Sequence, residues 1–74
     1  MTHYFICLKQ PSTQKWFNLV GPIETSEHAN SLVYQTRIEA HKIDPTTWWM
    51  DITVIGFDEI EPHHIGSLNH LILI

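Results

Sequence analysis

One stretch of helical periodicity, flanked by shorter apolar runs, constrains this sequence most. Six apolar or small residues recur at helical spacing: Ala29, Leu32, Val33, Thr36, Ala40 and Ile43. At about 100° per residue they fall in a single stripe. Thr25 or Ser26 can cap the start of this helix, and Asp44-Pro45 ends it, because the residue before proline resists the α region. We therefore predict one helix from about Ser26 to Lys42.

The runs on either side of this helix predict β-strands. His3–Lys9 is nearly continuously apolar, and Lys15–Val20 follows it after a proline-containing turn, so the two form a hairpin. Thr47–Phe57 alternates in hydropathy, which is typical of a half-buried strand. Residues 58–66 are polar and predict a loop. The apolar end of the chain, Ser67–Ile74, predicts a fourth strand, although a short helix fits so short a run equally well.

These elements predict a single α+β domain over residues 1–74, with the order β-β-α-β(-β). The third strand enters after a helix that reverses the chain direction. If it lies beside the first strand, every neighbouring pair is antiparallel and the sheet order is 2-1-3, or 2-1-3-4 with the fourth strand added. This order also places the most apolar strand in the centre of the sheet.

The alternation along the strands assigns the two faces of the sheet. The helix should cover Tyr4, Ile6, Leu8, Phe17, Leu19, Trp48, Met50, Ile52 and Val54. The opposite face then carries Phe5, Cys7, Trp16, Val20, Trp49 and Ile55. This face is too apolar to remain in water, so we expect the C-terminal segment or another chain to cover it.

Two surfaces are candidates for partner binding. The first is the open sheet face, where Phe5, Trp16, Trp49 and Ile55 supply the aromatic and aliphatic groups that dominate interfaces. A homodimer through this face would cover it. The second surface is the outer side of the helix, where Tyr34 and Ile38 lie one turn apart. The alternatives are a second small core under residues 65–74 and singly exposed side chains.

Composition disfavours several other functions. The chain has 74 residues, a formal net charge of −4 and only four Lys or Arg residues, which are scattered. Nucleic acids require clustered cations, so no nucleic-acid partner is expected. The sequence has no apolar run long enough to span a membrane and no signal peptide, so we expect a cytoplasmic protein without a membrane partner.

The sequence offers little for catalysis or metal binding. Cys7 lies within an apolar strand, which suits an inert thiol, and no catalytic or phosphate-binding motif occurs. We therefore predict that the chain is not an enzyme and has no cofactor. His63-His64 has acidic neighbours, but adjacent histidines on an extended segment point to opposite sides. We expect solvated histidines and no metal site.

These exclusions favour a small, non-enzymatic protein-binding module that acts by occupying the surface of a partner. In size, acidity and lack of catalytic motifs the chain is similar to accessory proteins of phages and plasmids. That similarity implies an inhibitor of a host defence protein. The alternatives are an assembly or homodimerisation subunit, and a small metal- or ligand-binding domain that uses the His63-His64 loop.

Overall fold

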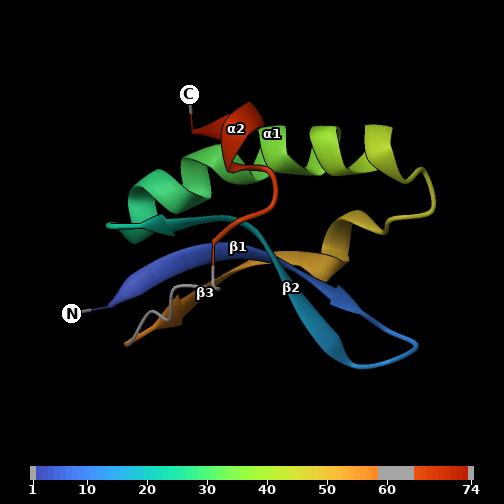
Figure 1. The fold of residues 1–74 in the computed structure, drawn as a ribbon, viewed down its shortest axis with the longest axis horizontal. Coiled ribbons are helices and arrows are strands. Elements are labelled where there is room, and N and C mark those ends of the chain that lie inside the picture. The colour runs from blue at the N-terminus through green and yellow to red at the C-terminus, as the bar shows by residue number, and fades with distance from the viewer. Residues whose placement is uncertain (1, 59–64, 74) are drawn as a thin grey trace.

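The computed structural model describes residues 2–58 and 65–73 of the chain. Its strands are β1 (His3–Gln10), β2 (Lys15–Ile23) and β3 (Ile52–Phe57). Its helices are α1 (Ser26–Ile43), the short 3₁₀ helix η1 (Trp49–Asp51) and α2 (Asn69–Ile72) (Figure 1). The predicted α+β architecture, with one main helix, is confirmed.

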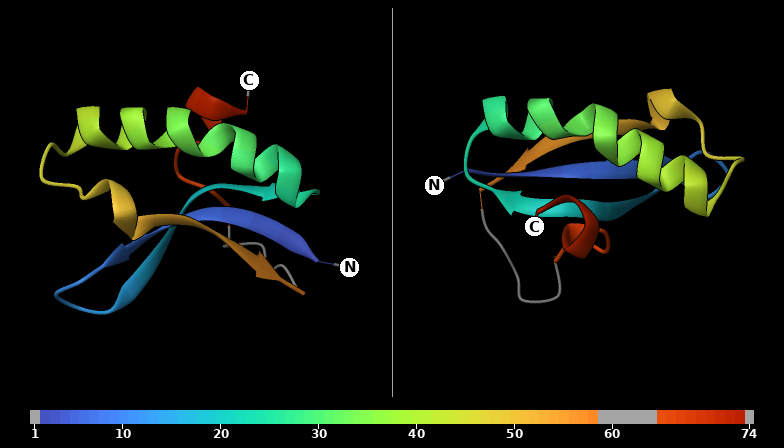
Figure 2. Two further views of the ribbon diagram at one scale, coloured as in Figure 1. Left: turned by 180° about the vertical axis from the view of Figure 1, so that it is seen from behind. Right: turned by 90° about the horizontal axis from the view of Figure 1, so that it is seen from above.

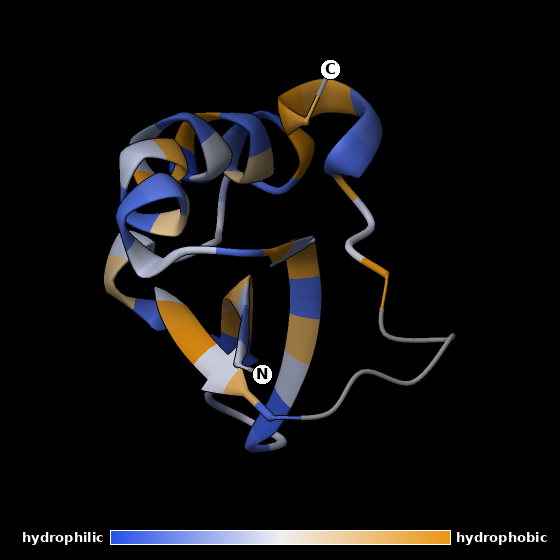
Figure 3. Ribbon diagram, turned by 90° about the vertical axis from the view of Figure 1, so that its left-hand side faces the viewer, coloured by the Kyte–Doolittle hydropathy of each residue, from blue (hydrophilic) through white to orange (hydrophobic). Residues whose placement is uncertain are grey.

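The three strands form one antiparallel sheet in the order β2-β1-β3, as predicted. β1 pairs with β2 on one side and with β3 on the other, so the most apolar strand lies in the centre. Helices α1 and α2 both lie on the same side of this sheet, as the end-on view in Figure 3 shows.

The core lies between the sheet and the helices. Ile6 and Ile52 from the sheet are fully buried there, and Ala29 and Ala40 from α1 pack against the same cluster. Thr36 is also fully buried, and its hydroxyl donates to the Leu32 carbonyl at 2.8 Å, so the polar group has a partner. Of the two predicted caps, Thr25 is the one that caps the N-terminus of α1, where its side-chain oxygen accepts from the His28 amide.

The third strand is shorter than the predicted range Thr47–Phe57. Asp44 holds the preceding residues in a turn, since its carboxylate accepts from the Thr46 amide at 3.0 Å and its carbonyl from the Thr47 amide. The chain then forms η1 before it enters the sheet at Ile52. Trp48 and Met50, predicted to face the core, are instead 66% and 67% exposed. The alternation before Ile52 is therefore not that of a strand.

The structure shows no fourth strand among the described residues. Residues 69–72 form α2, the alternative that the sequence left open. The residues before α2 lie along the outer edge of β2, where the Ser67 amide donates to the Asn18 carbonyl at 3.1 Å and the Leu68 amide to the Leu19 carbonyl at 2.7 Å. The C-terminal segment therefore lies beside β2, away from β3 (Figure 2, right).

The assignment of faces is wrong for Val20 and Phe17. The pairing of β1 with β2 shifts register on either side of Ile6, so strict alternation is lost there. As a result Leu19 and Val20 are both buried in the core, although they are neighbours in the sequence. Phe17 was predicted to be covered by the helix, yet it is 46% exposed.

Candidate functional site

The structure divides the six predicted partner-binding residues between two surfaces and the interior. Tyr34 and Trp49 come together, although the sequence placed them on different surfaces. Trp16 and Ile55 share the sheet face opposite the helices, as predicted. Of the other two, Phe5 is only 1% exposed, and Ile38 is half-buried, as Ile55 is.

The first surface, here called the aromatic end, consists of Tyr34, Trp48, Trp49 and Met50. The rings of Tyr34 and Trp49 meet edge to face, with centroids 6.0 Å apart and planes at 87°. Tyr34, Trp48 and Met50 are each about two-thirds exposed, at 65%, 66% and 67%. His41 and the turn residues before Trp48 line a hollow beside these side chains. The result is an exposed, largely apolar surface with the His41 imidazole at its rim.

Backbone contacts hold the aromatic end in place while its side chains remain exposed. The Asp51 amide donates to the Trp48 carbonyl at 3.0 Å and closes η1. Arg37 of α1 reaches the first residue of β3, where its Nη2 donates to the Ile52 carbonyl at 2.9 Å. Helix and strand are therefore joined directly beside η1, so the three exposed side chains of η1 and its N-cap project from a fixed backbone.

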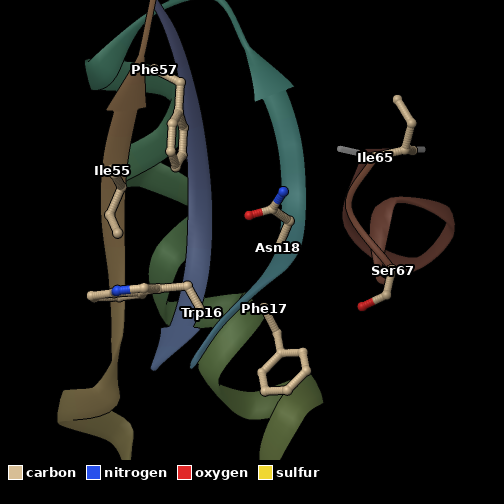
Figure 4. Close-up of a pocket in the computed structure, with 7 residues that line it drawn as sticks. All are labelled: Trp16, Phe17, Asn18, Ile55, Phe57, Ile65 and Ser67. Carbon is tan, nitrogen blue, oxygen red and sulfur yellow. The ribbon is translucent and has the colours of Figure 1, made fainter. Parts of the chain in front are cut away.

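The second surface, here called the sheet groove, is an open hollow of about 570 Å³ on the face opposite the helices. Its lining comprises Trp16, Phe17, Asn18, Ile55, Phe57, Ile65 and Ser67 (Figure 4). The Trp16 indole points from β2 across β1 toward Ile55 in this view. Lys9 Nζ lies 5.5 Å from the centre of the same ring, a cation–π contact.

Phe5 belongs to the interior of the sheet and not to an exposed binding surface. Its ring meets that of Phe57 edge to face at 5.6 Å. It also packs so closely on Gly21 that a Cβ there would lie 2.5 Å from the ring. Phe57, which was not among the predicted site residues, is half-buried and lines the sheet groove. Its place two residues after Ile55 on the same strand face was the available signal.

The single cysteine has the environment of an inert thiol. Cys7 is fully buried, and its Sγ donates to Asn18 Oδ1 at 3.3 Å. Burial raises the pKa of the Cys7 thiol to about 11, so it is neutral near pH 7 and a poor nucleophile. The prediction that the chain is not an enzyme remains a prediction.

The other predicted chemistry is largely outside the part of the chain that the structure describes. His63 and His64 lie outside the described residues. Within residues 2–58 and 65–73, no group of three or more His, Cys, Asp or Glu side chains is placed to hold a metal ion. Across the same residues, no helix combines the length and apolar character that crossing a membrane requires.

Trp48 and Met50 are the functional candidates that the sequence analysis missed. Alternation placed both in the core, because it was extended through the residues that precede Ile52. The signal that could have corrected this is Asp44-Pro45 followed by two threonines, since Asp-Pro favours a turn.

The chain was compared with family models, with curated proteins and with solved structures, and none of the three comparisons finds a match.

Proposed function

We propose that this protein is a non-enzymatic protein-binding module that uses the aromatic end to occupy an apolar surface of a partner protein. The observation that supports the proposal is the exposure of two tryptophans, a tyrosine and a methionine side by side. Small domains normally keep such side chains out of water, and contiguous exposed apolar surface marks sites of interaction.

The residue types fit a protein interface better than a site for a small polar ligand. Trp, Tyr and Met are enriched in the buried centres of interfaces, and Trp and Tyr are frequent hot spots. Trp48 and Met50 flank Trp49, which is steadied by its contact with Tyr34. A fixed aromatic group loses little conformational entropy on binding, so more of its burial contributes to affinity.

A partner with an apolar cleft is the expected target. Trp48 and Met50 are exposed enough to enter such a cleft, while His41 lies in the same lining as a polar group at its rim. Binding of this kind blocks a partner by steric occupation and needs no catalytic group. The prediction that the partner is a host defence protein depends on the similarity in size to phage and plasmid proteins and stays a prediction.

The test begins with affinity capture and identification of a partner, followed by calorimetric titration of that purified partner. The double variant Trp48→Ser/Met50→Ser is compared with Trp16→Ser, a matched loss of an exposed tryptophan from the sheet groove. Loss of hot-spot residues costs at least about 2 kcal/mol, or roughly 30-fold in Kd. Equal affinities for the double variant and the unmodified protein would contradict the proposal.

A further inference from the structure

Among the described residues nothing pairs with the outer edge of β3, whereas residues 66–68 lie along the outer edge of β2. β2 and β3 are the two edge strands. Residues 66–68 bond along β2, through the Gly66, Ser67 and Leu68 amides. No strand pairs with the outer side of β3 within the described residues, and Figure 2 (right) shows β3 on the side of the sheet away from α2.

The hydrogen bonds of Ile52 show which backbone groups of β3 face outward. Its amide donates to the Trp49 carbonyl and its carbonyl accepts from Arg37, so both groups have partners outside the pairing with β1. Alternate residues of a strand point their backbone groups to the same side, so Val54 and Gly56 also face outward. The described residues provide no partner for these two amides and two carbonyls.

The composition of this edge favours pairing with another strand. β3 has the sequence Ile-Thr-Val-Ile-Gly-Phe, without a charge or a proline. Natural edge strands usually carry lysine, proline or a bulge that prevents pairing. An uncharged strand with two amides and two carbonyls that have no partner among residues 2–58 and 65–73 is instead a template for strand addition.

We propose that β3 pairs antiparallel with β3 of a second copy of this chain, which gives a homodimer with a continuous six-stranded sheet. The free groups define the register. When Val54 of each copy faces Gly56 of the other, all four free groups of each strand are paired and the occupied groups of Ile52 are not needed. The two-fold axis then passes between the two copies of Ile55.

The side chains suit a second copy of the same strand. On the helix side Val54 meets Gly56, which has no side chain and allows close approach. On the opposite side Ile55 faces Ile55 of the second copy, and Thr53 lies beside its Phe57. Ile55 and Phe57 line the sheet groove, so the dimer extends this apolar surface across the axis.

Charge complementarity favours the same register. It places Asp58 of one copy opposite Ile52 of the other, whose carbonyl is held by Arg37. Asp58, whose carboxylate accepts from the Thr2 hydroxyl within its own copy, brings a negative charge toward Arg37 of the other copy on each side of the axis.

Sedimentation equilibrium on the full chain tests the dimer. We expect the mass to rise from 8.7 kDa toward twice that value as concentration increases between about 1 µM and 1 mM, the range expected of a small interface. Ile55→Lys places two ammonium groups opposite each other and should abolish the rise. Phe17→Lys, a groove residue away from the axis, should leave it unchanged, with circular dichroism confirming that both variants are folded.

Oxidative cross-linking tests the register. Ile55→Cys places two thiols opposite each other at the axis, where the Cβ atoms of directly opposite residues are about 4.5–5.5 Å apart. Thr53→Cys is the matched control, since Thr53 faces Phe57 of the second copy. We expect Ile55→Cys to form the disulfide-linked dimer at least about tenfold faster, through its higher effective concentration. The native Cys7 is buried in both variants.

Three results would overturn the proposal. The first is a monomer throughout the concentration range, and the second is equal cross-linking of the two cysteine variants. The third is a dimer that Trp48→Ser/Met50→Ser abolishes and Ile55→Lys does not, which would place the interface at the aromatic end. The dimer does not depend on the proposed function, because β3 pairing leaves partner binding by the aromatic end to be measured separately with the variants named above.

Discussion

Replacement of Asn69 by alanine should make the C-terminal segment easier to unfold and should lower the stability of the whole domain. Asn69 Oδ1 accepts from the Gly21 amide at 2.8 Å, and Asn69 Nδ2 donates to the Gly21 carbonyl. The carbonyl keeps a second partner, the Gly66 amide at 3.2 Å, but the Gly21 amide loses its side-chain acceptor. Because Gly21 is buried, its orphaned amide carries the larger cost.

An unpaired buried donor costs about 1–3 kcal/mol, so we expect Asn69→Ala to lower the free energy of unfolding by about 2 kcal/mol. For a domain of this size, 2 kcal/mol corresponds to a decrease in Tm of roughly 10–15 °C. Urea unfolding followed by tryptophan fluorescence measures the change. His70→Ala, an exposed neighbour on α2, is the control. A loss below about 0.5 kcal/mol, equal to that of the control, would refute this account of how the C-terminal segment is held.

Three further predictions concern the core. Gly21→Ala should destabilise the fold far more than Gly56→Ala, because Gly21 has φ of 142° and a Cβ there would meet the Phe5 ring at 2.5 Å; thermal melts compare the two. Ile52→Ala should cost about 2–4 kcal/mol in urea unfolding, since the side chain is fully buried. The free energy of unfolding should fall between pH 9 and 11. The Cys7 thiol ionises near pH 8.5 in the unfolded chain, whereas its pKa in the folded protein is about 11. Between these values the unfolded state binds fewer protons than the folded state, so rising pH favours unfolding. Chemical denaturation measures this loss of stability, which should be absent from the control variant Cys7→Ala.

The sheet order was predictable because it depends on the hydropathy of each strand and on the number of helices, which can both be read from short stretches of sequence. Composition marked β1 as the central strand, and the single helical stripe allowed one crossover that keeps every pair antiparallel. The helix was also well predicted, since Thr25 caps it and Asp44-Pro45 ends it. These signals act within a few residues, so tertiary contacts did not override them.

The errors arose where the backbone departs from regular geometry. The register shifts beside Ile6 bury Leu19 and Val20 together, and hydropathy alternation cannot anticipate such an irregularity. Asp44 accepts hydrogen bonds from the Thr46 and Thr47 amides, and the resulting turn makes β3 begin only at Ile52. Trp49 therefore lies beside Tyr34 and not on the sheet face. The candidate site was therefore predicted by residue type and only partly by location.

The aromatic end is the central claim, and hydroxyl-radical footprinting of the complex with the captured partner tests it most directly. Trp48 and Met50 are both oxidisable and about two-thirds exposed in the free protein, whereas Trp16 is 46% exposed on the other surface. We predict that binding lowers the oxidation rates of Trp48 and Met50 several-fold and leaves that of Trp16 unchanged. Protection of Trp16 with no protection of Trp48 and Met50 would contradict the account and place the partner on the sheet groove.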